Sequence, residues 1–360
     1  MAKKKKMTKK KKQLIVWLIL LALLALLRLK AVSPAEQGSS EVLQSQVFED
    51  SSFEVHFIDV GQADAALVLC DGEAMLIDGG NREDSSLLYS YLKQYEVDHL
   101  DYMVATHAHE DHVGGLLGAL NYAQVDTAYC PVGSYDSDSF ENFVKYLAKQ
   151  DRAITIPQAG DSFALGSAVV QIVGVDSEAD DTNNTSIVLR VVYGDTSFLF
   201  TGDAEREAEE LILSSGYEIE STVLKVGHHG SESSTSYPFL REVDPAYAVI
   251  SVGEGNTYGH PTEEVLSRLR DADVETYRTD LQGTIVCSSD GETVTFKTQN
   301  AVEKPVGTDY VANQNPSSMK FHKPSCGSVE SMKEEYRFYF TGTREELIAM
   351  GYAPCGSCKP

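Results

Sequence analysis

The sequence feature that most constrains this fold is residues 103–116, MVATHAHEDHVGGL. Three histidines and two acidic residues crowd into six positions, from His107 to His112, directly after an apolar run. Polar groups at the end of a buried strand cost free energy unless they are paired or bind a metal. We therefore expect a functional site where this strand ends.

The other motif histidines also follow strand-like runs. His228 and His229 lie in KVGHHGS, His260 lies in NTYGHP, and Asp203 ends LFTGD. The ends of neighbouring strands meet at one edge of an α/β body, where such folds place their sites. A single histidine after a strand would be an ordinary polar loop residue, but six histidines with an aspartate indicate a shared site.

The local spacing within the first motif favours metal binding. His107 and His109 can point the same way from an extended segment, whereas Asp111 and His112 turn away at the start of a helix. This arrangement offers two adjacent sets of ligands. Imidazole and carboxylate groups suit Zn²⁺, or Mn²⁺ and Fe where more oxygen ligands join. Asp203 is the natural carboxylate to bridge two ions.

The chain from Phe53 onward alternates short strand-like runs with helix-like segments. Continuous apolar strands covered by helices predict a layered α/β body with buried sheets. The six cysteines form no regular disulfide pattern, and those at 70, 130 and 287 lie inside strand-like runs. We expect these three to be small buried residues.

The first 35 residues are expected to be a targeting segment. They hold ten of the 30 basic residues and no acid, and an unbroken apolar run covers residues 14–27. Fourteen helical residues span about 21 Å, so the run suits either a signal peptide cleaved after SPA or an uncleaved anchor with snorkelling Lys and Arg. In both cases the lysines stay in the cytoplasm and the body lies outside the cell.

The rest of the chain is strongly acidic, with 20 basic against 54 acidic residues, a formal charge of −34. Such a charge repels polyanions at long range and argues against a broad DNA-binding surface. A local phosphate site neutralised by metal ions is still compatible with it. Within the expected site, Lys225 is interpreted as a snorkelling strand lysine, and Asp59 and Asp64 as turn caps.

These motifs resemble a known family. THAHEDHVGG is similar to the HxHxDH signature of the metallo-β-lactamase superfamily. The motifs FIDVGQADAALV, LIDGG, NNTSIVLRVVYG, FLFTGD, LKVGHHGS, NTYGHP and YRTD resemble the extracellular hydrolase domain of ComEC-type competence proteins, in order, over residues 53–297. The resemblance implies a four-layer αββα fold, a dinuclear metal centre and hydrolysis of a phosphodiester or a related bond. Two ions of Zn or Mn would activate a water.

The resemblance also implies roles for individual residues. His107 and His109 would hold the first metal, and Asp203 would be shared. The second metal set would comprise Asp111, His112 and His228 or His229, of which we assign His228. The catalytic set would comprise Asp111, His229 and His260, where His260 is otherwise a turn residue before a proline. Asp64, Asp78 and Asn184 would support and orient the metal ligands without binding the metal.

Two departures from the family pattern matter. Ala63 stands where the family usually has glycine, which affects the loop that carries Gln62 and Asp64. In addition, the metal-binding histidine that many relatives carry before the TGD strand is missing, and Asn183 and Asn184 occupy that region. Competence-type relatives share this asparagine pattern, which is expected to weaken the first metal site.

The last 43 residues resemble the small metal-binding domain of the Ada repair protein. His322 and Cys326 form one pair and Cys355 and Cys358 another, which indicates a closed structural zinc site. A module of this size has little core, so metal would supply folding energy. The alternatives are a disulfide from Cys326 to one of the other two cysteines, or a redox CxxC.

The functional hypothesis is an exported or membrane-anchored, metal-dependent phosphodiesterase that acts on nucleic acid. The first alternative is an esterase of phosphocholine or other small phosphoesters, and the second is a non-catalytic assembly factor for DNA uptake. The expected organisation is a signal or anchor segment (1–35), a tether (36–52), a hydrolase domain (53–298), a linker (299–317) and a zinc-binding module (318–360).

Overall fold

A computed structural model describes residues 52–300 and most of 310–360, namely 310–313, 315, 318–324, 326–333, 336–340 and 344–360. The expected signal or anchor segment and nearly all of the tether lie outside these residues. No helix among the described residues is long and apolar enough to cross a membrane.

The first sheet has eight strands, in the order β15-β14-β1-β2-β3-β4-β5-β6. Its β3 to β6 half is parallel, and the β15 to β3 half is antiparallel. Its strands are β1 (Phe53–Phe57), β2 (Ala66–Cys70), β3 (Glu73–Ile77), β4 (His99–Val104), β5 (Gln124–Tyr129), β6 (Ile154–Thr155), β14 (Ile285–Ser289) and β15 (Val294–Thr298).

The second sheet has seven strands, in the order β13-β12-β11-β10-β9-β8-β7. It is parallel from β10 to β13 and antiparallel from β7 to β10, as in the first sheet. Its strands are β7 (Ser162–Leu165), β8 (Ala168–Gly174), β9 (Val188–Tyr193), β10 (Thr196–Phe200), β11 (Val223–Lys225), β12 (Tyr247–Ile250) and β13 (Glu275–Arg278).

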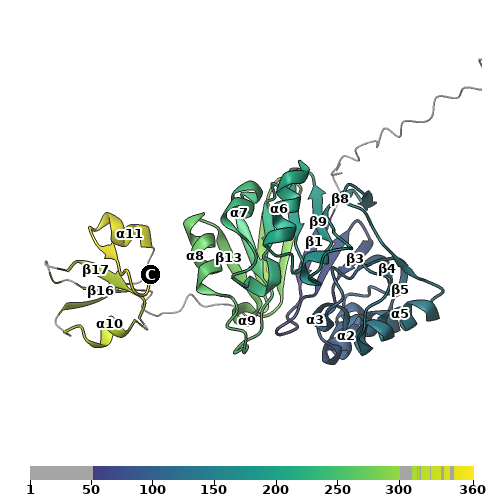
Figure 1. The fold of residues 1–360 in the computed structure, drawn as a ribbon, viewed down its shortest axis with the longest axis horizontal. Helices are drawn as coiled ribbons and strands as arrows, with labels where there is room; N and C mark the ends of the chain where they lie inside the picture. The colour runs from purple at the N-terminus through teal and green to yellow at the C-terminus, as the bar shows by residue number, and fades with distance from the viewer. Residues whose placement is uncertain are drawn as a thin grey trace, which may run out of the picture. The chain divides into compact units, whose positions relative to one another are not determined.

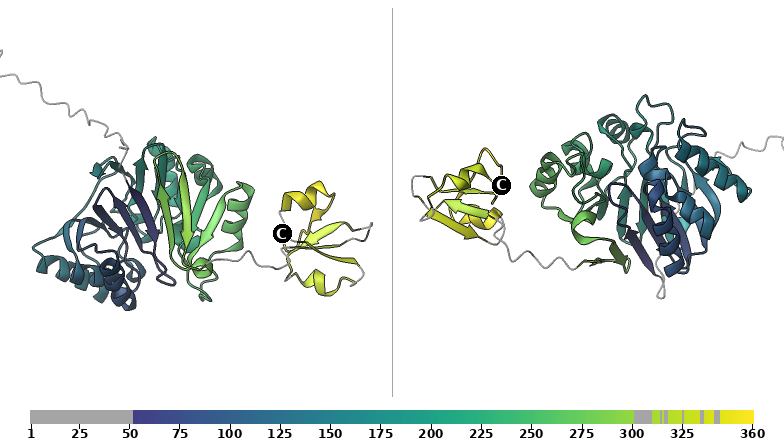
Figure 2. Two further views of the ribbon diagram at one scale, coloured as in Figure 1. Left: turned by 180° about the vertical axis from the view of Figure 1, so that it is seen from behind. Right: turned by 90° about the horizontal axis from the view of Figure 1, so that it is seen from below.

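Helices cover the outer face of each sheet (Figures 1 and 2). Against the first sheet lie α2 (Ser85–Gln94), α4 (Leu116–Tyr122) and α5 (Asp138–Lys149), and against the second lie α6 (Arg206–Ser215), α7 (Tyr237–Val243) and α8 (Glu263–Asp271). Short turns complete the body: η1 (Arg82–Asp84), α3 (Glu110–Val113), η2 (Asn183–Thr185), η3 (Gly227–Gly230) and α9 (Thr279–Gln282). The expected four-layer αββα fold is confirmed.

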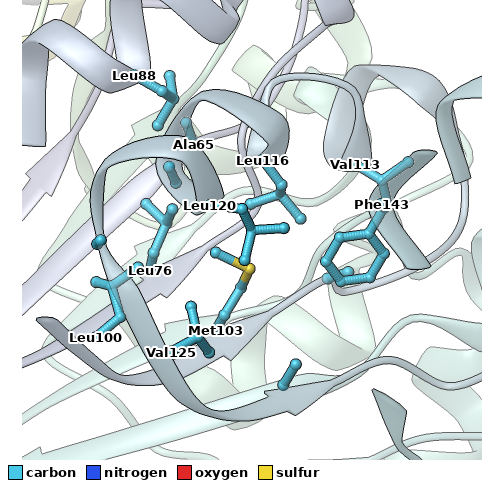
Figure 3. Packing of buried hydrophobic residues seen from close by; sticks show 14 of the residues in the cluster. Ala65, Leu76, Leu88, Leu100, Met103, Val113, Leu116, Leu120, Val125 and Phe143 are labelled. Carbon is cyan, nitrogen blue, oxygen red and sulfur yellow. The ribbon is translucent and has the colours of Figure 1, made fainter. Parts of the chain in front are cut away.

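Three apolar cores separate these layers. The first lies between the first sheet and its helices, where Leu76 and Met103 meet Leu116 and Leu120 (Figure 3). The second fills the space between the two sheets with large side chains such as Phe57 and Phe200. The third lies under α6 to α8. Because both faces of each sheet are buried, the strands are apolar without strict alternation, as the sequence indicated.

The C-terminal residues form a separate four-stranded sheet, in the order β18-β16-β17-β19. Its elements are β16 (Tyr310–Asn313), β17 (Lys320–His322), α10 (Gly327–Glu330), β18 (Arg337–Phe340), α11 (Arg344–Ala349) and β19 (Ala353–Pro354). Two small apolar clusters support it, one built around Cys326 and Cys355 and the other around Phe321 and Leu347.

Candidate metal centre

The polar motifs converge on the carboxyl ends of the parallel strands of both sheets. Asp78 follows β3, the three-histidine motif follows β4, and Asp203 follows β10. The histidine pair follows β11, and the loop that carries His260 follows β12. Because these ends face the same edge of the layered body, residues as far apart in the sequence as Asp78 and His260 meet in one place.

His107 and His109 form the first group of ligand atoms. Nε2 of His107 lies 3.0 Å from Nδ1 of His109 and 4.0 Å from Oδ2 of Asp203. His107 is fully buried, and the two rings meet nearly edge to face, with an interplanar angle of 79°. These three side chains are the ones expected around a first metal ion.

Asp111, His112, Asp203 and His229 form the second group, with one ligand atom from each lying within 4.8 Å of all the others. Nε2 of His229 lies 3.3 Å from Oδ2 of Asp111 and 3.7 Å from Oδ2 of Asp203. Nε2 of His112 lies 3.3 Å from Oδ1 of Asp203. Asp203 therefore faces both groups, as a bridging carboxylate would.

In this second group, the Nδ1 atom of each histidine contacts an oxygen acceptor. Nδ1 of His112 lies 2.8 Å from Oδ2 of Asp78, and Nδ1 of His229 lies 3.0 Å from the Ser251 carbonyl oxygen. Each contact places the ring proton on Nδ1, which leaves Nε2 as a lone-pair donor on the side of Asp111 and Asp203. Asp78 is fixed in turn by the backbone amide and hydroxyl of Thr106, at 2.8 and 2.7 Å.

Asp78 adopts a left-handed backbone conformation, with φ of +58°. Backbone strain of this kind in a residue other than glycine gathers at functional sites. The turn also packs tightly: Gly79 N donates to the His112 carbonyl oxygen and Gly115 N to that of Gly80. The LIDGG turn thus clamps the start of the HVGGL segment and fixes the direction of His112.

Two buried atoms in the second group lack hydrogen-bond partners. Nε2 of His112 and Oδ1 of Asp203 are inaccessible to solvent, and their mutual contact lacks hydrogen-bonding geometry. A buried polar atom without a partner costs about 1–3 kcal/mol. A cation held between Asp111, His112, Asp203 and His229 would satisfy both atoms, so the side chains present fit a divalent metal.

The electrostatics of the cluster couple its acids to its imidazoles. Burial raises the pKa of Asp203, but the nearby His112 and His229 outweigh burial and hold this pKa well below its usual range. Burial lowers the pKa of His112, but Asp203, Asp78 and Asp111 raise it well above the ordinary value. Burial is the main reason that the pKa of His107 lies well below 6.5.

The structure distinguishes the two histidines of KVGHHGS. His229 is buried within the second group, whereas His228 is partly exposed and its Nδ1 lies 3.1 Å from Oε1 of Glu205. Nε2 of His228 lies 3.7 Å from Oδ2 of Asp203. This placement favours His229 as the ligand and leaves His228 beside the cavity, which exchanges the two roles assigned from the sequence. Glu205 was not singled out in the sequence, although it follows Asp203 by only two positions.

Asn183 and Asn184 point in different directions. Asn183 lines the cavity, where its Oδ1 is buried without a hydrogen-bond partner. Asn184, the residue predicted to support the metals, contacts the start of α6: its Nδ2 donates to Glu207 and its Oδ1 accepts from Glu205 N. Asn183 therefore lies at the cavity, whereas Asn184 holds the backbone two positions after Asp203.

The prediction that Lys225 snorkels to solvent is wrong. Lys225 is only 5% exposed, and its Nζ donates to Oδ2 of Asp64 at 2.8 Å and to the Val226 carbonyl oxygen at 2.9 Å. Asp64, expected to cap a turn, is also buried and lies within 4.8 Å of ligand atoms of Asp78 and His112. A cation from the second sheet therefore compensates the acids behind the metal ligands.

The ligand groups open into a cavity of about 340 Å³. His260 lies at its edge, where its ring contacts that of His228 with centroids 5.7 Å apart. Gln62 and Asn81 also line it, and the Gln62 side chain accepts a hydrogen bond from Gly253 N. The full lining comprises Gln62, Asn81, His109, Glu110, Asp111, Asn183, Asp203, His228, His229, Tyr258 and His260.

The C-terminal sheet brings His322, Cys326, Cys355 and Cys358 together, with one ligand atom from each within 4.8 Å of all the others. All three cysteines are free thiols. Burial raises the pKa of Cys355, but hydrogen bonds from the Cys358 and Ser357 amides outweigh burial and lower it to about 7. Four such donors in a closed cluster fit a tetrahedral Zn²⁺.

Comparisons with known proteins agree with these motifs. A profile of the metallo-beta-lactamase superfamily matches residues 58–254. ComE operon protein 3 of Bacillus subtilis (strain 168) is 30% identical over 254 residues, 65% of this chain and 33% of that protein. Competence protein ComA of Neisseria gonorrhoeae is 46% identical over 106 residues, 29% of this chain and 15% of that protein.

A third relative and a solved structure also match. Recombination protein 2 of Haemophilus influenzae is 31% identical over 228 residues, 61% of this chain and 26% of that protein. The chain therefore spans a third or less of the length of these three relatives. The crystal structure of the metallo-beta-lactamase fold protein YhfI from Bacillus subtilis is 13% identical, with a TM-score of 0.43, and covers 68% of this chain and 100% of that one.

Proposed function

The chain belongs to the metallo-beta-lactamase superfamily, and from that premise we propose that it is a metal-dependent phosphodiesterase that cleaves DNA. The observation that carries the proposal is the pair of ligand groups that share Asp203. Two-ion sites of this kind suit in-line displacement at phosphorus. The relatives named for competence and recombination favour DNA over other phosphoesters.

In the proposed centre, these side chains would hold two divalent ions, Zn or Mn. His107, His109 and Asp203 would hold one, and Asp111, His112, Asp203 and His229 would hold the other. When bound, the ions supply Lewis acidity and neutralise the charge of the substrate phosphate. The chain's own contribution is to fix the ligand rings through Asp78 and the Ser251 carbonyl, and to keep the ligand atoms away from bulk water.

His260 and His228 are the proposed hydrogen-bond donors to the substrate at the cavity. Burial and the neighbouring His228 and His229 lower the pKa of His260, so its ring is neutral at pH 7. Its Nδ1 is buried without a hydrogen-bond partner, which leaves it available to a group that enters the cavity. A neutral imidazole at this position donates a hydrogen bond to a phosphoryl oxygen and so stabilises the charge that develops there.

An esterase of phosphocholine or other small phosphoesters is the second candidate. The described lining of the cavity contains no Lys or Arg, and the chain carries a net charge of −24. Both features disfavour long runs of phosphate contacts and are compatible with a small or zwitterionic substrate. The third hypothesis, a non-catalytic factor of a DNA-uptake machine, leaves the ligand groups without a role.

A paired assay separates these functions. The purified protein is incubated with Mn²⁺ or Zn²⁺ and either labelled single-stranded DNA or p-nitrophenyl phosphocholine. The proposal expects degradation of DNA and its loss in His109→Ala. Hydrolysis of the choline ester alone would assign the esterase function. A metal-loaded protein that cleaves neither substrate would support the non-catalytic role.

The remaining parts of the chain receive proposed roles as well. We place the hydrolase body at 53–298 and a zinc-binding, Ada-like module at 318–360, joined by a linker. Residues 1–35 are proposed to export the chain or to anchor it with the catalytic body outside the cell. Protease accessibility of the body on intact cells tests that orientation.

A further inference from the structure

Tyr258 is an exposed aromatic residue at the mouth of the proposed catalytic cavity. Its side chain lines the cavity, and the residue is 72% exposed, more than any other large hydrophobic residue described in the chain. Its ring faces that of His260, with centroids 5.8 Å apart and planes inclined by 28°. The far face of the Tyr258 ring is thus open at the edge of the site.

The loop that presents Tyr258 is held firmly in spite of this exposure. The side-chain oxygen of Asn256 accepts from the amides of Tyr258 and His260, at 3.2 and 3.1 Å. Its amide nitrogen donates to the carbonyl oxygens of Gly253 and His260, at 3.0 and 2.6 Å. The side-chain amide of Asn256 therefore fixes both ends of the loop. An exposed ring on a fixed backbone loses little entropy when a ligand binds.

The composition of the cavity lining favours substrate recognition by an aromatic ring. No Lys or Arg belongs to the described lining, so phosphate contacts beyond the metal ions are scarce. Stacking of a base on an aromatic ring contributes about 1–3 kcal/mol without any phosphate contact. It also requires an unstacked base, which a single strand offers more readily than a duplex.

We propose that Tyr258 is the stacking platform for a nucleobase next to the scissile phosphate, which makes single-stranded nucleic acid the substrate class of this site. The proposal rests on the proposed phosphodiesterase function. It assigns Tyr258 to substrate specificity, because the ring touches the base and not the reacting phosphorus.

The test compares two strands that differ only in their bases. One is an oligothymidine, and the other is an abasic strand of the same length with the same phosphates. The full-length, metal-loaded protein should cleave the oligothymidine with a KM about tenfold lower than that of the abasic strand. In Tyr258→Ala this ratio should fall to about one, whereas Tyr258→Phe should retain it.

Tyr237→Ala is the matched control, since Tyr237 is also exposed, at 55%, and lies on α7 outside the cavity lining. It should keep the tenfold ratio. The stacking role would be overturned if the wild type cleaved both strands with the same KM, or if Tyr258→Ala kept the tenfold difference in KM. In either case the nuclease function would stand. A protein that cleaves neither strand would overturn both proposals.

Discussion

His112 and His229 each use one ring nitrogen for position and keep the other for the cavity. The sequence places His112 and the histidine pair 228–229 after two strands, and in the structure these strands are β4 and β11. Their supporting contacts were only partly foreseeable. Asp78 was expected to orient the ligands. The contact with the Ser251 carbonyl oxygen was not expected, because every residue has a backbone oxygen and the sequence does not show which one is used.

Contacts with residues distant in the sequence decide where Lys225 and Asn184 lie. Lys225 was expected in solvent because a lone lysine is costly to bury, but Asp64, 161 positions away, compensates its charge. Asn184 was expected near the metals, but the 3₁₀ turn at Asn183–Thr185 directs it toward α6 and leaves Asn183 in the cavity. Local spacing does not determine either outcome.

Metal binding should release protons. Burial lowers the pKa of both His112 and His229, but Asp203 and its neighbours outweigh burial and raise each above 6.5 in the metal-free protein. A metal must displace these protons, so its affinity should rise as pH rises through the raised pKa values. Calorimetry in buffers with different ionisation enthalpies should detect between one and two protons released at pH 6.5. Binding without proton release would contradict the assignment.

At the scale of elements, the fold was predictable because its strands are buried on both faces and end in polar motifs. The contact between the LIDGG turn and the HVGGL segment was harder to predict from the sequence. A Cβ at position 115 would lie 1.9 Å from the Gly79 carbonyl oxygen, so only glycine fits. The two glycine-rich motifs are therefore partners in one close backbone contact.

Gly115→Ala should separate these two turns. We expect a loss of about 1–3 kcal/mol in the free energy of unfolding, because an inserted methyl group forces the backbone apart. Urea denaturation measures it. Gly133→Ala is the control, since a Cβ there meets nothing within 4 Å. Equal stability of both variants would mean that the contact is looser than described.

The C-terminal sheet should depend on its own metal. Cys355→Ser removes one of four clustered donors, so the variant should contain one zinc equivalent fewer than the wild type. Ser357→Ala leaves all four donors and should keep the zinc. Elemental analysis of both variants gives the result. A full zinc complement in Cys355→Ser would argue against the tetrahedral site.

At the scale of the whole molecule, charge and site chemistry act in opposite directions. The chain carries a net charge of −24, yet its proposed substrate is a polyanion. The sequence predicted this tension. The cavity contains ligand groups for cations and an exposed aromatic ring, and no Lys or Arg belongs to its described lining. The stacking role of Tyr258 was not predictable, since an exposed tyrosine in a loop has no distinctive spacing.

Substrate binding should therefore depend weakly on salt. Each phosphate contact contributes about −0.7 to the slope of log affinity against log salt for single strands. With contacts restricted to one or two phosphates at the metals, we expect a slope no steeper than about −1.4. The slope is obtained from KM values for oligothymidine measured at salt concentrations between about 50 and 200 mM. A much steeper slope would indicate a basic surface elsewhere on the chain.

The metal content of the purified chain tests the central claim most directly. Two ions in the hydrolase body and one in the C-terminal cluster predict about three equivalents per chain. Asp203→Asn should lose at least one, because Asp203 faces both ligand groups, while Asp195→Asn, an exposed acid in a turn, should lose none. A folded wild-type chain without transition metal, or an Asp203→Asn variant with the full complement, would contradict the account.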